Sequence, residues 1–144
     1  ESEIRVVQLR IGIVLSPHGG ALAKMLMPFR MGLGGVIGNG KQYMSWISID
    51  DLLGVIHHTI TDSNAVGPVN AVAPNAVTNR EFTRVLGSVL NRPTVFPLPA
   101  FVAKLAMGQM AEELLLSSTR VSSNTKYVFR HPDLQTALRH VLGR

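Results

Sequence analysis

The pattern of hydrophobic positions alternates between strand-like and helix-like spacing along the chain. Residues 4–15 read IRVVQLRIGIVL, a β-branched and almost continuously apolar run. Such a run is typical of a strand that is buried on both faces of a parallel sheet. Similar strands are expected at residues 67–73 and, shorter, within residues 42–49. Because the first run has no partner before it, we expect its neighbouring strands to come from polypeptide outside this sequence.

Segments whose apolar residues have helical spacing lie between these strands. Apolar residues at i, i+3, i+4 and i+7 within residues 22–29 predict a helix that Pro28 ends or kinks. Two capping boxes, Ser48 with Asp51 and Thr78 with Glu81, each predict the start of a further helix. The inner faces expected for these two helices are Leu52, Leu53, Ile56 and Ile60, and Phe82, Val85, Leu86, Val89 and Leu90.

The chain becomes mostly helical after a proline-punctuated linker at residues 93–99. An apolar helix is expected over residues 100–117, with a break near Gly108, and a closing helix is expected to begin at Pro132 and end at Gly143. The buried face expected for the closing helix is Leu134, Ala137, Leu138, Val141 and Leu142. These elements together predict a mixed α/β fold.

Composition and charge narrow the class of protein. Apolar residues make up 46% of the chain, which argues against disorder, and Gly, Pro or charge interrupts every apolar run, so no membrane span is expected. The acidic start at residues 1–3 argues against a secretory signal. There are no cysteines, and a reducing, cytoplasmic compartment is the expectation. Basic residues are concentrated in residues 120–144, but they are scattered among apolar positions, which favours a solvated helix face over nucleic-acid binding.

A glycine-rich segment at residues 32–40 matches two nucleotide-binding patterns in part. Gly32, Gly35 and Gly38 have the spacing of a dinucleotide fingerprint, but a helix rather than a strand is expected before them. The near-match to a phosphate-binding P-loop has Gln42 where a Ser or Thr is required. A flexible or substrate-covering loop is the better interpretation.

Other polar residues offer few catalytic groups. His57 and His58 are about 100° apart on a helix, so a shared metal is not expected. Asp50 and Asp51 are a candidate acid/base pair, although a helix's first turn favours carboxylates and capping explains them more simply. For the single tryptophan, Trp46, ligand contact and core packing remain open alternatives.

The order of several segments resembles one known family. Their order is that of the epimerase family of the short-chain dehydrogenase/reductase superfamily, and they read LRIGIVL, GGAL, SWI-IDDL, GPVNAVAP and FRHPDL. Members of this family include nucleoside-diphosphate-sugar epimerases and cell-division inhibitors. Members of this family are about twice as long. The resemblance therefore implies the C-terminal half of an extended Rossmann-like fold. The catalytic Tyr-x-x-x-Lys pair of the superfamily is absent, because Ile47 and His131 stand four residues after the two tyrosines.

The resemblance also implies a division of the chain and a set of contacts. Residues 1–95 would be the C-terminal portion of the Rossmann-like domain, and residues 96–144 the family's mostly helical, substrate-side domain of unknown function. NADP or NAD is the cofactor implied for the full-length protein, with no tight binding to this chain alone. The residues implied for cofactor contact are Gly12, Val14 and Leu15. Those implied for substrate contact are Lys24, Phe29, Arg30 and Trp46.

The chain departs from the family pattern at two places. The family usually has His where this chain has Ser48, which weakens an acid/base function there, and the connection between residues 121 and 131 is about four residues short. The expected full-length function is NAD(P)-dependent epimerisation of a nucleotide sugar, with this chain alone not catalytically competent. The alternative is a non-catalytic cofactor-binding or regulatory module. The expected partners are the missing N-terminal half, a small-molecule substrate and, through exposed apolar surface, a second copy.

Overall fold

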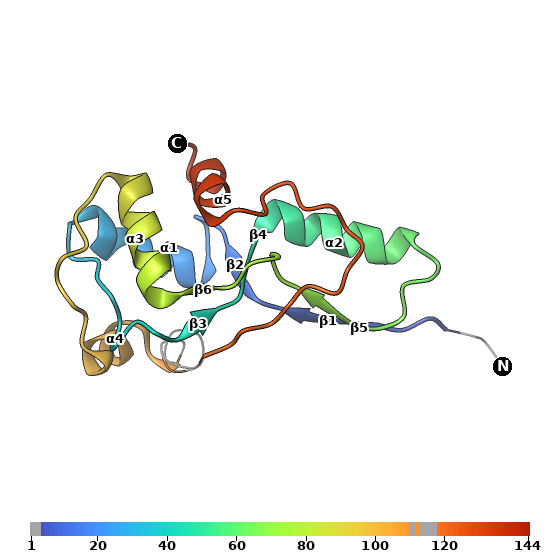
Figure 1. Ribbon diagram of the computed structural model, residues 1–144, viewed down its shortest axis with the longest axis horizontal. Coiled ribbons are helices and arrows are strands. Elements are labelled where there is room, and N and C mark those ends of the chain that lie inside the picture. Colours follow the sequence, from blue (N-terminus) through green and yellow to red (C-terminus); the bar gives the residue numbers. More distant parts are fainter. Residues whose placement is uncertain (1–3, 110–111, 113–117) are drawn as a thin grey trace.

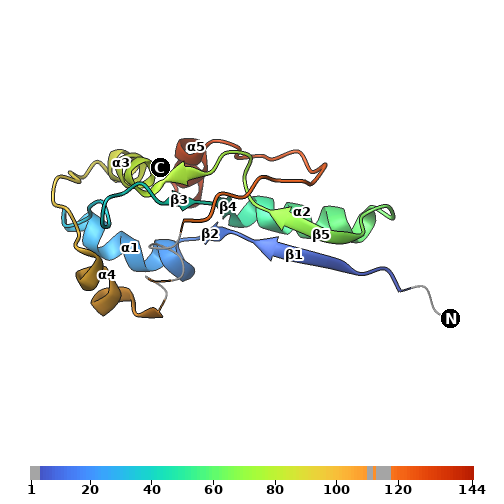
Figure 2. The ribbon, with the colours of Figure 1, turned by 60° about the horizontal axis from the view of Figure 1, so that its bottom comes forward.

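The computed structural model describes residues 4–109, 112 and 118–144. The molecule is elongated, with the N-terminal strand at one end and helices α1 (Gly20–Arg30), α3 (Asn79–Leu90) and α4 (Ala100–Met107) at the other (Figure 1). Helix α2 (Ile49–Thr61) lies along the strands, and helix α5 (Leu134–Val141) lies between the two ends (Figures 1 and 2).

The predicted strand at residues 4–15 is two strands, β1 (Val7–Ile11) and β2 (Ile13–Leu15), separated at Gly12. Strand β1 pairs in parallel with β5 (Gly67–Ala71), and β2 pairs in parallel with β4 (Trp46–Ser48). A short antiparallel pair, β3 (Tyr43–Met44) with β6 (Val77–Thr78), extends toward the helical end. The predicted α/β class is therefore correct, with the short strand expected at 42–49 present as β3 and β4.

Gly12 is where the strand changes partners. The Gly12 N–H donates to the carbonyl of Ala71, the last residue of β5, and the next N–H, of Ile13, donates to the carbonyl of Ser45 beside β4. A Cβ at Gly12 would lie 2.7 Å from the Ser45 carbonyl oxygen and 2.9 Å from a methyl of Val72. Only glycine lets the two neighbouring backbones approach this closely, so the switch of partners depends on it.

The sequence predicted that the run at residues 4–15 is buried throughout, but part of it is exposed. Ile13 and Leu15 of β2 are buried, but Val6 and Ile11 are 59% and 50% exposed. Within the described residues, β1 pairs with β5 along one edge and with no strand along the other. Among the described residues β1 is therefore only partly buried, and no described strand pairs with its second edge.

The face of α2 that packs on the sheet also differs from the prediction. Leu53 and Ile60 were expected inside, but they are 58% and 68% exposed. Leu52 is buried as predicted and Ile56 packs partly buried against the same apolar cluster, but Val55 and Thr59 are buried in place of the other two. Leu52 and Val55 share that cluster with residues of β4 and β5. The error is one of phase, because Leu53 is turned about 100° from Leu52 around the helix axis.

The remaining helices agree with their predicted faces. All five apolar positions predicted for α3 are buried, and α5 buries Leu134, Ala137 and Leu138. Helix α5 begins two residues later than expected, at Leu134, because the Asp133 side chain caps it by accepting from the Thr136 N–H. Helix α4 ends at Gly108, where a break was expected, and much of the remaining predicted helix to residue 117 lies outside the described residues.

Residues 118–131 form an irregular segment, which we call the return segment, that runs from β3 along β5 to the start of α2 (Figure 1). The Asn124 side chain donates to the Pro68 carbonyl and accepts from the Asn70 N–H, both on β5. The return segment thereby satisfies polar groups on the outer edge of this small sheet.

Candidate functional site

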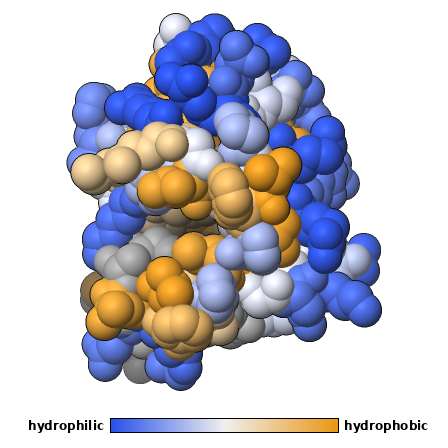
Figure 3. Space-filling view, turned by 90° about the vertical axis from the view of Figure 1, so that its left-hand side faces the viewer, coloured by the Kyte–Doolittle hydropathy of each residue, from blue (hydrophilic) through white to orange (hydrophobic). Residues whose placement is uncertain are grey.

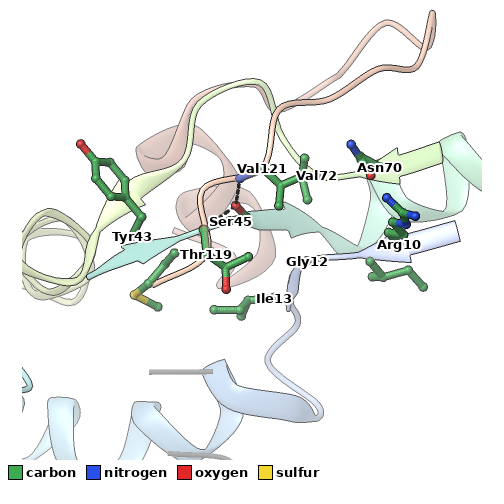
Figure 4. A pocket seen from close by; sticks show the side chains of 11 residues that line it. Arg10, Gly12, Ile13, Tyr43, Ser45, Asn70, Val72, Thr119 and Val121 are labelled. Atoms are coloured by element: carbon green, nitrogen blue, oxygen red, sulfur yellow. Dashed lines mark hydrogen bonds between the residues drawn. The ribbon is translucent and has the colours of Figure 1, made fainter. Parts of the chain in front are cut away.

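A cavity of about 330 Å³ lies where β1 passes into β2. Strands β1, β3 and β5 and the return segment enclose it, and Figure 4 shows their side chains around the opening. Its lining residues are Arg10, Ile11, Gly12, Ile13, Tyr43, Met44, Ser45, Asn70, Val72, Thr119 and Val121. We call this the junction cavity.

Ser45 builds one wall of the junction cavity. Its hydroxyl donates to the Thr119 carbonyl at 2.8 Å and accepts from the Val121 N–H at 2.9 Å, as drawn in Figure 4. Because both hydrogen bonds go to backbone groups, Ser45 positions the return segment. The sequence analysis did not identify this function, although a hydroxyl between two apolar residues of a buried strand was the available signal.

The charge around the junction cavity is positive. Arg10 lines it from β1, and the Arg120 guanidinium stacks on the Tyr43 ring with its carbon 4.7 Å from the ring centroid. No acidic side chain is among the described lining residues. The surroundings therefore suit an anionic or polar ligand rather than a cation.

Of the three residues implied for cofactor contact, one lines the junction cavity and two lie farther along β2. Gly12 lines the junction cavity, whereas the Val14 side chain packs toward α2 and Leu15 is fully buried in the main core. Leu15 therefore offers a ligand only its backbone. Helix α1 follows the end of β2 after a short turn, and no side chain caps its first N–H groups at Gly19.

The residues implied for substrate contact do not converge. Lys24 and Phe29 line an apolar cavity of about 370 Å³ between α1, the glycine-rich segment and Leu98. Arg30 lines a different hollow, on the side of α1 near Pro17. Hydrophobic side chains gather on this end of the molecule (Figure 3), including exposed Met27, Met31, Leu33, Phe96 and Phe101.

Trp46 packs in the main core, with 1% of its surface exposed. Its indole N–H donates to the Asn75 carbonyl at 3.0 Å. Of the two alternatives that the sequence left open, core packing is the one that the structure displays, although Trp46 also borders a hollow between α3 and α5.

The glycine-rich segment does not have the context of a dinucleotide fingerprint. It lies between α1 and β3, so no strand precedes it and no helix follows it directly. The Val36 carbonyl accepts from the Leu98 N–H, and the Gly38 N–H donates to the Leu98 carbonyl. The segment therefore packs against the proline-punctuated linker.

Asp51 is the most highly connected polar side chain near the sheet. It is fully buried and accepts hydrogen bonds from the Arg130 N–H at 2.7 Å, the His131 N–H at 3.0 Å, the Tyr127 hydroxyl and the Ser48 hydroxyl. Burial alone would raise the pKa of this carboxyl, but the backbone and hydroxyl hydrogen bonds outweigh it and lower the pKa. Burial and the Asp51 charge in turn raise the pKa of Tyr127.

The two adjacent aspartates therefore do different things. Ser48 caps α2 by accepting from the Asp51 N–H, as the capping box predicted. Asp51 anchors the return segment, and Asp50 turns instead to His140, with 2.7 Å between the carboxylate oxygen and Nε2. They do not form a paired acid/base site.

Comparisons with known proteins identify the chain. A family model described as a domain of unknown function (DUF1731) matches residues 98–141. The human epimerase family protein SDR39U1 is 39% identical over 143 residues, covering 96% of this chain and 49% of the human protein. The epimerase family protein Mb2239 of Mycobacterium bovis is 40% identical over 148 residues and is also covered over 49% of its length. The chain thus spans about half the length of the curated relatives it matches.

Solved structures agree with the sequence matches. The crystal structure of human SDR39U1 with NADPH superposes with a TM-score of 0.91 at 37% identity, over 99% of this chain and 50% of that one. A UDP-N-acetylglucosamine 4-epimerase from Bacillus cereus superposes with a TM-score of 0.69 at 13% identity, which shows a shared fold alone. No helix among the described residues has the length and apolar character needed to cross a membrane. The chain corresponds to the C-terminal half of epimerase family proteins such as human SDR39U1, including a C-terminal domain of unknown function.

Proposed function

We propose that this chain supplies the substrate-side half of an NAD(P)-dependent protein that resembles nucleoside-diphosphate-sugar epimerases. The observation that carries the proposal is the unpaired edge of β1 beside the junction cavity. A strand edge with exposed apolar neighbours needs further strands to cover it. Because the chain spans half of relatives that include one solved with NADPH, polypeptide from the other half is the natural source of those strands and of the remaining cofactor site.

The described residues suit part of a cofactor site. In the complete protein, the backbone at the end of β2 and the wall at Gly12 would orient the nicotinamide end, since neither offers a charged side chain. When bound, the nicotinamide would accept a hydride from a sugar carbon and return it to the opposite face. The uncapped start of α1 and the guanidinium groups of Arg10 and Arg120 would favour the phosphates of a nucleotide ligand.

The positions of the residues proposed for substrate contact suggest which part of a ligand each of them would meet. Lys24 and Phe29 border one apolar cavity, so an ammonium group and an aromatic ring lie at the same opening. Arg30 and Trp46 lie elsewhere, and any contact they make would involve a different part of the substrate. The Lys24 charge would then pair with an anionic group, while Phe29 would pack on an apolar face of the ligand.

A second candidate function is a non-catalytic, cofactor-binding regulatory module. It is favoured by Ser48, which stands where the resemblance implies a histidine and which donates its hydroxyl to Asp51, while Asp51 holds the return segment. Neither residue is free to exchange a proton with a ligand.

NADPH titration tests whether another half completes the cofactor site, and an epimerisation assay separates the two proposals. The full-length protein should bind NADPH in isothermal titration calorimetry, whereas this chain alone should show no sub-micromolar affinity. Sub-micromolar binding to this chain alone would overturn the proposal that another half completes the site. Incubating the full-length protein and cofactor with UDP-hexoses, followed by proton NMR, should show interconversion of epimers. Cofactor binding without interconversion of any UDP-hexose would favour the regulatory module.

A further inference from the structure

Three metal-binding side chains from separate elements meet on the surface beside α2. Asp50 comes from the first turn of α2, His131 from the end of the return segment, and His140 from the last turn of α5. Their potential ligand atoms all lie within 4.8 Å of one another. The His140 Nε2 is 2.7 Å from an Asp50 carboxylate oxygen, and the two imidazole rings are stacked with centroids 4.3 Å apart.

Buried contacts determine where the three backbones lie. The His131 N–H donates to the buried Asp51 carboxylate, so this backbone is held against the start of α2. Leu134 and Leu138 place α5 in the main core, which brings its last turn to the same point. The cluster is therefore preorganised by groups other than its own exposed side chains.

We propose that Asp50, His131 and His140 bind a divalent transition metal ion, with zinc as the best match. Two imidazoles and one carboxylate are a donor set that zinc accepts, whereas magnesium and calcium prefer oxygen ligands throughout. With metal–ligand distances of about 2.0–2.1 Å, a tetrahedral site needs ligand atoms about 3.3 Å apart. The observed separations, 2.7 Å for the Asp50–His140 pair and no more than 4.8 Å within the cluster, lie on either side of this distance, so binding requires that pair to open slightly.

A surface pair between Asp50 and His140 is the simpler alternative, but it leaves His131 unexplained. The His131 ring stacks on the His140 ring, so both imidazoles lie near the Asp50 carboxylate, and the partly exposed position leaves room for water as a fourth ligand. The metal would join α5 and the return segment to α2. Binding to the folded state alone would then raise the thermal midpoint of the protein.

The test uses the purified protein without an affinity tag, stripped with a chelator and titrated with zinc chloride. We expect saturable binding at one site per chain, no comparable binding of magnesium chloride, and a thermal midpoint that rises with zinc. The substitutions H131A, H140A and D50N should each weaken zinc binding at least tenfold. The matched control is H58A, because His58 forms the other His–Asp contact of the described residues, 3.8 Å from Asp62.

A cobalt titration locates the site independently of affinity. Cobalt bound in place of zinc should give visible d–d absorption that is lost in H140Q, a variant that keeps a hydrogen-bonding group opposite Asp50 and whose folding is checked by circular dichroism. The proposal is overturned if zinc does not bind saturably. It is equally overturned if H58A weakens binding as much as H140A, or if folded H140Q keeps the cobalt spectrum.

Discussion

Removing the Asp51 carboxylate should destabilise the protein more than any other single polar change near α2. In Asp51→Ala, the N–H groups of Arg130 and His131 and the hydroxyls of Tyr127 and Ser48 lose their shared acceptor. A buried donor left without a partner costs about 1–3 kcal/mol, and hydrogen bonds to a charged group are at the stronger end. The two backbone donors alone predict a loss of about 2–6 kcal/mol, since the hydroxyls can turn toward other partners.

Asp51→Asn separates the charge from the shape. The amide keeps one acceptor oxygen but presents N–H donors where the carboxylate accepted, so one backbone N–H, of either Arg130 or His131, would face another donor. We expect a smaller loss of about 1–3 kcal/mol. Equilibrium urea unfolding measures both, with the fluorescence of the single, buried Trp46 as the probe.

The pH dependence of the same difference is a further check. The folded-state pKa of Asp51 is lowered, so the stability that its charge contributes is present above the unfolded-state value of about 4 and is lost as the pH falls through the folded-state value. The difference in the free energy of unfolding between the wild-type protein and Asp51→Asn should therefore become smaller below about pH 4. The control is Asp50→Asn in the presence of a chelator, because an exposed pair contributes about 0–1 kcal/mol. Equal urea midpoints for Asp51→Ala and Asp50→Asn would refute the assignment of Asp51 as the anchor.

Two glycine substitutions test the close contacts on either side of the sheet. Gly12→Val should lower the urea midpoint by the equivalent of about 1–3 kcal/mol, since its Cβ would lie 2.7 Å from the Ser45 carbonyl oxygen, while Gly19→Ala, with open space around it, should not. Gly54→Ala would ordinarily stabilise a helix by about 1 kcal/mol, but its Cβ would overlap the Tyr127 hydroxyl, so we expect a net loss and faster amide exchange at Arg130. A stabilised Gly54→Ala protein would show that the tyrosine is not packed on α2.

The sequence predicted most of the elements because their signals are local. Capping boxes at Ser48 and Thr78 and the apolar spacing of α3 depend on neighbours within one or two turns, and the structure confirms them. The face of α2 was predicted correctly at Leu52 and Ile56 but wrongly at Leu53 and Ile60, because these two are apolar as well. On a helix with apolar residues on two sides, only the position of the sheet decides which side is buried.

The candidate site was harder to predict because its parts are distant in sequence. Ser45 meets the backbone of Thr119 and Val121, more than seventy positions away, and Asp51 meets Arg130 at a similar separation. No period or spacing encodes such contacts. The sequence did provide the position of Gly12 through the family resemblance, but the structural reason for a glycine there is the approach of two backbones from other elements.

The contacts of the return segment bear on how the two parts of the chain are related. A boundary near residue 95 stays a prediction, yet the main core contains Ala103 and Leu138 together with Ile13 and Leu22. Independent domains have their own cores and few contacts across the boundary. Here the C-terminal part shares a core with α1 and β2, and Asp51 adds a buried polar anchor to the same junction. The C-terminal part is thus a continuation of the main core, so a change in the return segment would reach the junction cavity through Ser45 and α2 through Asp51.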